Sequence, residues 1–404
     1  MRRRLFFASC LSLAICGALF AIRSAAADEF VEEFAADKAL IGAVLSMGFY
    51  GMGWVIAIAS PLCDYLGMRF LLLLAAVLHL LGITSFMFAP GTETDPTLFW
   101  AQSTMLLVGL AHGLVEGVIN PLIATLYPEE KTHKLNVLHA WWPGGIIAGG
   151  LLAYGLREGG FGWEWAWSIC LIPSLIYGGV AFGSEFPKTE RTASGVTATE
   201  MFKAALNPLF LLFFALMAVT AATELGTGSW LESVLQTTAG FPGILLLVYG
   251  SGLMFVLRFF AGPIAHRISP IGLLCVSAAL AAIGLWLLTG VETAAMGIFG
   301  ATVFYIGVCY FWPTMLAVVS ERAPKSGALG MGLLAASGFL GSAWLTGHMG
   351  GIYDAEGAAA AFRFATWLPV GLFVVFALVW IGFSMRGGYR VERLGGDNDA
   401  GGAD

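Results

Sequence analysis

The sequence contains few charged residues, since Asp, Glu, Lys and Arg make up only 11% of its 404 positions. A soluble globular protein carries about 25% charged residues, so this chain could not cover the surface of soluble domains. The six cysteines are scattered and show neither the spacing of a disulfide framework nor that of a zinc site. A Gly-rich loop ending in Lys and Ser or Thr is also missing, which argues against ATP as the energy source.

Apolar residues, in contrast, make up 58% of the chain, and the mean hydropathy is +0.82. Runs long enough to cross a bilayer, about 20 residues each, recur along the whole sequence. No alternating barrel pattern occurs, so these runs must be helices that satisfy their own backbone groups. The sequence therefore predicts an all-α integral membrane protein. Its twelve expected spans start near Leu5, Leu40, Phe70, Leu98, Leu135, Trp163, Asn207, Gly243, Ile271, Thr293, Gly327 and Ala361.

The N-terminus resembles a secretory signal, with three arginines, an apolar run and then three alanines. We nevertheless expect it to be retained, because the run from Leu5 to Ile22 is long and its removal would leave an odd number of spans. Lys and Arg concentrate in the loops on the side of the N-terminus. The positive-inside rule then places both termini in the cytoplasm, in a membrane that we expect to be the bacterial inner (plasma) membrane.

The chain divides into two similar halves. We expect a six-helix bundle over residues 1–185, a cytoplasmic loop over 186–205, a second bundle over 206–385 and a disordered tail over 386–404. Residues recur at a constant offset of 192, as in the pairs Pro121 and Pro313 or Gly149 and Gly341. Parallel halves that move around a central site are a transporter architecture.

The loop after the second expected span contains Asp64, Gly67 and Arg69, with Ser60 four residues before the aspartate. This spacing resembles the signature of the major facilitator superfamily, where Ser60 stands in place of a Gly. The resemblance implies the major facilitator fold and assigns Asp64, Gly67 and Arg69 to the conformational switch. Asp64 could pair with Arg69 or cap a helix end. The alternative is an ordinary positively charged cytoplasmic loop.

Polar side chains form one stripe on the expected helix over residues 98–127. His112, Glu116 and Asn120 follow one another at a spacing of four, which places them on one face. Ionisable groups inside a membrane span are costly and commonly functional. Glu116 could hold or release a proton as its exposure alternates, or it could make a structural hydrogen bond to a neighbouring helix.

The segment from Glu116 to Asn120, followed by Pro, resembles the fucose–proton symporter branch of the same superfamily. In that branch this glutamate lies in the sugar cavity, and the resemblance gives Glu116 and Asn120 that role. His139 corresponds to a polar residue that follows, and Glu224 begins a Glu-x-Gly-x-x-x-Trp pattern. Trp312 lies in an aromatic-Pro-Thr segment whose ring faces the sugar in that branch. The sequence leaves open whether His139 contacts a solute or satisfies a buried carbonyl.

The first span departs from this branch, because Arg23 stands where an Asn and Asp cluster is typical. Proton coupling through a carboxylate there is therefore not available. Three interpretations of Arg23 remain open: it extends to the membrane surface, it pairs with Glu224 as an outer gate, or it binds an anionic substrate. For Arg258, farther along the chain, we expect a structural pair or contact with the membrane surface.

The leading hypothesis is a secondary active transporter, not an enzyme, that carries a small polar solute such as a sugar by proton symport. The proton carrier is Glu116 or Glu224. Alternatives are an organic-anion carrier using Arg23, a sensor that binds without transport, and an intramembrane enzyme using Ser251. We expect a monomer without cofactor or nucleic-acid partner. No expected span carries two His or Asp ligands at metal-binding spacing, so no metal site is predicted.

Overall fold

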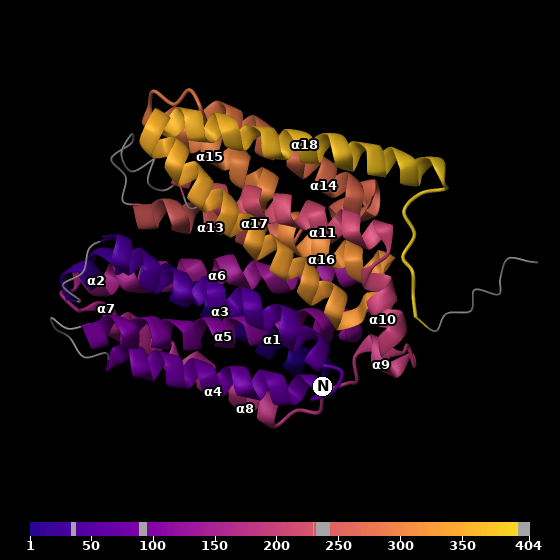
Figure 1. Cartoon of the computed structure of the whole chain (residues 1–404), viewed down its shortest axis with the longest axis horizontal. Helices are drawn as coiled ribbons and strands as arrows, with labels where there is room; N and C mark the ends of the chain where they lie inside the picture. Colours follow the sequence, from indigo (N-terminus) through magenta and orange to yellow (C-terminus); the bar gives the residue numbers. More distant parts are fainter. Residues whose placement is uncertain (34–37, 89–94, 229, 232–242, 395–404) are drawn as a thin grey trace, which may run out of the picture.

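The computed structural model describes residues 1–33, 38–88, 95–228, 230–231 and 243–394, and this part of the chain contains helices and turns but no strand. Figure 1 shows two groups of aligned helices packed side by side, one from each half of the sequence. Both ends of the described chain lie at the same end of this assembly, which is called the terminal end below. The expected all-α architecture is confirmed.

The first half forms the group drawn in indigo and purple in Figure 1. Its helices are α1 (Arg2–Ala25), α2 (Ala27–Glu33), α3 (Lys38–Leu62), α4 (Met68–Met87), α5 (Asp95–Leu126), α6 (Lys131–Glu158), α7 (Trp163–Ile169) and α8 (Leu171–Phe182). Two short helices then link the halves at the terminal end, α9 (Glu190–Ala193) and α10 (Ala198–Ala205). A capping box of Thr197 and Glu200 starts α10.

The second half forms the group drawn in pink, orange and yellow. Its elements are α11 (Pro208–Ala221), the π-helical segment η1 (Ala222–Gly226), α13 (Gly243–Arg258), α14 (Ala261–Leu288), α15 (Ala294–Val308), α16 (Phe311–Arg322), the short η2 (Pro324–Ser326), α17 (Gly327–Glu356) and α18 (Ala358–Met385).

Ten helical stretches of the described chain are long and apolar enough to cross a membrane. Some combine two consecutive elements, such as α7 with α8 and α15 with α16. Together with α6, which has 28 residues, and the shorter apolar helix α13, they account for the predicted twelve spans. A turn at Ser269–Pro270 interrupts α14, because Ser269 has non-helical φ and ψ values of 68° and 160°.

Glycines let helix backbones touch at equivalent places in the two halves. A Cβ atom built on Gly149 of α6 would lie 2.5 Å from the backbone oxygen of Ala18 in α1. A Cβ atom on Gly341 of α17 would lie 2.2 Å from the backbone oxygen of Ala218 in α11. The offset of 192 relates these two glycines, so the repeat found in the sequence corresponds to a repeated backbone contact.

The first part of the tail differs from the disordered segment that its composition predicts. Tyr389 donates a hydrogen bond of 2.7 Å to a carboxylate oxygen of Glu321, and the Glu392 N–H donates to the Glu321 backbone oxygen at 2.8 Å. Burial, together with the Glu321 carboxylate, raises the pKa of Tyr389 well above its usual value and keeps the phenol protonated as a donor. Residues 386–394 are therefore held at the terminal end, whereas residues 395–404 lie outside the described residues.

We expect Gly145→Ala to destabilise the first half. A Cβ atom at Gly145 of α6 would lie 1.9 Å from the backbone oxygen of Ala14, so α1 and α6 would have to move apart. Overpacking of this kind costs about 1–3 kcal/mol of the free energy of unfolding, and the Tm in detergent should fall. The matched control is Gly155→Ala in the same helix, where the added Cβ would meet nothing within 4 Å. Equal Tm values for the two variants would contradict the tight contact between α1 and α6.

Candidate functional site

Five polar side chains meet at the boundary between the halves and are called the central cluster. They are Glu116 and Asn120 of α5, His139 of α6, Glu224 of η1 and Arg258 of α13. Each side chain belongs to a residue that is at most 7% exposed. Buried ionisable groups are stable among membrane-spanning helices only when they are paired, so their partners identify what holds the cluster together.

The contribution of the first half is a continuous chain of hydrogen bonds. The Asn120 amide nitrogen donates to Oε2 of Glu116 at 2.9 Å and to the Glu116 backbone oxygen at 2.8 Å. Because this amide nitrogen is a donor, the amide oxygen of Asn120 accepts from Nε2 of His139, which lies 2.8 Å away. The arrangement therefore requires a proton on Nε2 of His139. The stripe predicted on this helix is confirmed for Glu116 and Asn120, which share these contacts.

Arg258 connects this chain to the second half. Its NH1 atom donates to the backbone oxygen of His139 at 2.6 Å, and its NH2 atom lies 2.9 Å from Oε1 of Glu224. Its Nε atom donates to the backbone oxygen of Cys309 at 2.7 Å. All three guanidinium nitrogens thus have acceptors, and one of these acceptors belongs to the opposite half.

The π-helical segment η1 determines where Glu224 lies. Five residues, Ala222–Gly226, form this wider turn at the end of α11, and all of them except Leu225 are buried. Such segments occur rarely inside α-helices, but where they occur they frequently lie at functional sites. The wider turn changes the direction in which a side chain points. Here the changed direction carries the Glu224 carboxylate to Arg258.

The central cluster borders a small cavity of about 40 Å³. The lining side chains include Glu116, His139, Trp142, Glu224, Arg258, Trp312 and Phe339. The Trp312 and Phe339 rings pack with their centroids 4.9 Å apart, and the indole nitrogen of Trp312 has no hydrogen-bond partner in the described part of the chain. Clefts that hold small molecules measure about 300–1,000 Å³, so the halves must separate before a solute can enter.

Arg23 does not lie in this site. Its NH1 atom donates to the backbone oxygen of Leu45 at 3.1 Å, and its guanidinium stacks on the rings of Phe20 and Phe49. Only 6% of Arg23 is exposed, so it does not extend to the membrane surface. Of the three interpretations of Arg23, the pair with Glu224 is contradicted, because Glu224 pairs with Arg258 instead.

The structural pair expected as one possibility for Arg258 is present, with Glu224 as its partner, but the sequence did not predict that Arg258 belongs to the site. The signal that could have identified it was the charge balance of the second half. Glu224 and Arg258 are opposite charges on neighbouring expected spans, and a buried carboxylate requires a nearby cation or hydrogen-bond donors. Spacing within one helix could not show this pair, because the two residues belong to different helices.

The three residues of the predicted conformational switch lie at the terminal end, with Asp64 and Gly67 between α3 and α4 and Arg69 at the start of α4. Asp64 pairs with Arg191 of α9, with 2.7 Å between Oδ2 and Nε, and accepts hydrogen bonds from Thr189 and Thr192. Gly67 has a φ of 83° just before α4, a conformation that glycine adopts without strain. Arg69 donates to the backbone oxygen of Phe182, so Asp64 does not pair with Arg69 here.

Further polar contacts join the halves at the terminal end. Lys131 of α6 lies 2.7 Å from Glu190 of α9 and donates to the backbone oxygen of Ser320 in α16 at 3.2 Å. Thr132 donates to the Glu321 carboxylate at 2.7 Å. This end of the boundary is therefore closed by hydrogen bonds between side chains of both halves.

Comparisons with known proteins agree with this architecture. Residues 5–346 match the family model described as the Major Facilitator Superfamily. The fucose:proton symporter of E. coli superposes with a TM-score of 0.73 at 15% identity, covering 92% of this chain and 98% of that chain. The E. coli xylose transporter, in a partially occluded inward-open conformation, also gives a TM-score of 0.73 at 15% identity, covering 95% and 97% of the two chains.

A D-xylose transporter of Levilactobacillus brevis is similar in sequence over a shorter segment. It is 27% identical over 147 residues, which is 33% of this chain and 30% of the length of that relative. The two structural matches establish the shared fold.

We expect Arg258→Met to destabilise the protein by about 3–5 kcal/mol, because it leaves Glu224 buried without its cation. The double variant Arg258→Met/Glu224→Gln should recover part of this loss, measured by thermal unfolding in detergent. Arg157→Met is the control, because Arg157 is exposed and lies 3.6 Å from Glu29, where a pair contributes less than about 1 kcal/mol. A double variant less stable than Arg258→Met would contradict this account of the pair.

Proposed function

The chain belongs to the Major Facilitator Superfamily, and on that premise we propose that it is a secondary active transporter that moves a sugar or sugar derivative by proton symport. The observation that carries the proposal is the small cavity between the halves, where two carboxylates, a guanidinium and two indole rings converge. A hydroxyl-rich solute requires hydrogen-bonding groups around its edge and an aromatic ring against its apolar face.

Trp312 provides both kinds of contact at one position. Its ring borders the cavity, and its indole N–H, which has no partner within the described residues, is available to a solute oxygen. The names of the compared proteins support the same solute class, because they describe transporters of xylose and fucose. Together these observations favour a neutral sugar over other polar solutes.

Glu116 is the proton carrier in this proposal, and Glu224 is not. Glu224 lies 2.9 Å from the Arg258 guanidinium, which stabilises its charged form. Glu116 accepts a hydrogen bond from the neutral amide of Asn120, so it can gain or lose a proton without breaking an ion pair. Protonation of Glu116 alters the hydrogen bonds that run from Glu116 through Asn120 to His139. Because Glu116 and His139 both line the cavity, the hydrogen-bonding groups that face a solute change as well.

Transport follows from movement of residues 1–185 against residues 206–385, while residues 186–205 connect them. Opening toward the terminal end must break the contacts of Lys131 with Ser320 and of Thr132 with Glu321. Separation at the cluster must break the hydrogen bond from Arg258 to the His139 backbone oxygen. Asp64, Gly67 and Arg69 lie beside the terminal end of the boundary and act as part of the conformational switch, with Arg191 of the connecting segment as the partner of Asp64.

The alternative functions have less support. An organic-anion carrier using Arg23 is not favoured, because Arg23 contacts a backbone oxygen and two rings away from the cavity. Members of a transporter family are not enzymes, which argues against catalysis by Ser251. A sensor that binds without transport would show solute binding but no flux.

The protein acts as a monomer in the bacterial inner (plasma) membrane, with both termini in the cytoplasm. The support for this orientation is the concentration of Lys and Arg in the loops at the terminal end. Lys131, Lys134 and Arg191 all belong to segments that lie at this end.

We expect Glu116→Gln to abolish uphill sugar uptake while leaving exchange of sugar across the membrane intact. The amide cannot release a proton, but it preserves the size of the side chain and its contact with Asn120. Uptake driven by a pH gradient and counterflow in proteoliposomes measure the two activities separately. Glu292→Gln, at an exposed position, is the matched control. Loss of both activities in Glu116→Gln would instead place Glu116 in substrate binding.

We expect neutral hexoses or pentoses to raise the Tm of the detergent-purified protein, because a ligand of the folded state stabilises it. Trp312→Phe keeps a ring but removes the indole N–H, so it should weaken the apparent affinity by roughly 2–10-fold, as for one net hydrogen bond. Trp344→Phe, at a position that is 57% exposed, is the control. Stabilisation by sugar acids or carboxylates alone would overturn the assignment of a neutral sugar.

A further inference from the structure

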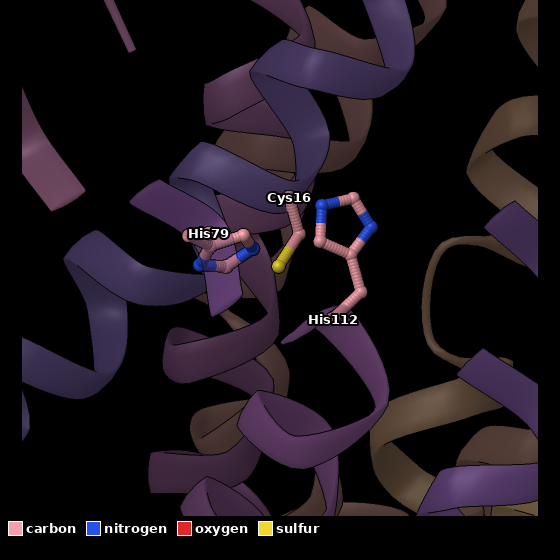
Figure 2. Close-up of side chains that lie close together, drawn as sticks. All are labelled: Cys16, His79 and His112. Atoms are coloured by element: carbon pink, nitrogen blue, oxygen red, sulfur yellow. The ribbon is translucent and has the colours of Figure 1, made fainter. Parts of the chain in front are cut away.

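A group of three soft or borderline metal ligands lies in the first half. Figure 2 shows the sulfur of Cys16 between the imidazole rings of His79 and His112. The three residues come from α1, α4 and α5, and they are 0%, 0% and 6% exposed. One possible ligand atom from each residue lies within 4.8 Å of the other two.

Two imidazole nitrogens of this group are buried and, among the described residues, unpaired. Nε2 of His79 and Nε2 of His112 have no hydrogen-bond partner in the described part of the chain. Buried polar atoms in proteins nearly always have a partner. Two such nitrogens beside a thiol therefore indicate a ligand that all three can bind.

A further contact orients one of the rings for this purpose. Nδ1 of His79 lies 2.9 Å from the hydroxyl of Tyr177 in α8. When Nδ1 carries the proton and donates it to Tyr177, Nε2 presents a lone pair to the group. A hydrogen bond from the second ring nitrogen is the usual way in which a protein orients a metal-binding histidine.

We propose that Cys16, His79 and His112 form a binding site for a soft monovalent transition-metal ion, Cu(I). One thiolate and two imidazoles are donors that suit Cu(I) or zinc. Zinc in protein sites prefers four ligands, and within the described residues this group provides three. The choice between the two ions then depends on charge.

Charge favours the monovalent ion. A Cys16 thiolate with Cu(I) is neutral as a whole, whereas the same ligands with Zn²⁺ keep one positive charge in a medium that penalises charge. Arg23 already brings a positive charge to α1, about two turns beyond Cys16, and Glu116, one turn beyond His112, is engaged by Asn120. On binding, the Cys16 thiol, which now donates to the Ser12 backbone oxygen at 3.2 Å, releases its proton to solvent.

The geometry needs only a small adjustment. Metal–ligand bonds of 2.0–2.3 Å place neighbouring ligand atoms about 3.5 Å apart, compared with the limit of 4.8 Å in this group. Rotation of the two imidazole rings can close that difference. Because the ligands come from three helices, the bound ion would link α1, α4 and α5, and it would stiffen the part of α5 that carries Glu116.

The test is a titration of the full-length protein in detergent with Cu(I), under anaerobic conditions, against a chromophoric Cu(I) chelator. We expect one equivalent to bind, and Cys16→Ser or His112→Gln to weaken binding by more than about tenfold. Tyr177→Phe should weaken it by roughly 10–100-fold, as for other contacts that orient a metal ligand. Cys10→Ser is the matched control, because Cys10 is a buried cysteine of the same helix.

X-ray absorption of the Cu(I)-loaded wild-type protein gives a second measurement that does not depend on the folding of variants. We expect one sulfur and two nitrogen neighbours. Binding that is unchanged in Cys16→Ser, or a coordination shell without sulfur, would overturn the site. Tighter binding of Zn²⁺ than of Cu(I), lost in Cys16→Ser, would overturn the assignment of the ion.

Discussion

A guanidinium enclosed among membrane-spanning helices keeps its charge only when a counter-ion and enough acceptors surround it. Arg258 meets this requirement with the Glu224 carboxylate and two backbone oxygens, those of His139 and Cys309. One acceptor lies in the other half of the molecule, so the same contacts that stabilise Arg258 also determine where the halves meet. Any movement that parts the halves at this point must provide new acceptors for Arg258.

The remaining polar groups of the site contact Arg258 directly or through one another. The backbone oxygen of His139 accepts a hydrogen bond from Arg258, and its ring donates to the amide oxygen of Asn120. Asn120 in turn donates to Glu116. The two carboxylates of the site therefore differ in environment although both are buried. One is neutralised by a cation, whereas the other is held by a neutral amide, and this difference separates a structural carboxylate from one that can exchange protons.

Much of the fold could be predicted from the sequence, because apolar runs, turn residues and the repeat are local or periodic signals. The family was also identifiable, from the loop that carries Asp64 and Arg69. Within the site, the stripe of Glu116 and Asn120 was predictable from the helical period. Contacts between helices were not, because spacing along one helix carries no information on its neighbours. For this reason the sequence left three interpretations of Arg23 open and did not identify Arg258 as the partner of Glu224.

The link between the halves is more than a flexible tether. Two consecutive residues of α9, Glu190 and Arg191, pair with Lys131 and Asp64 in the first half. A Cβ atom on Gly327, where α17 begins in the second half, would lie 3.1 Å from the Cβ of Arg191. The link is thus bound to the first half by ion pairs and packs against the second half, so it limits how closely the halves approach at this end. Its sequence and length are therefore under the same geometric constraint as the helices that it joins.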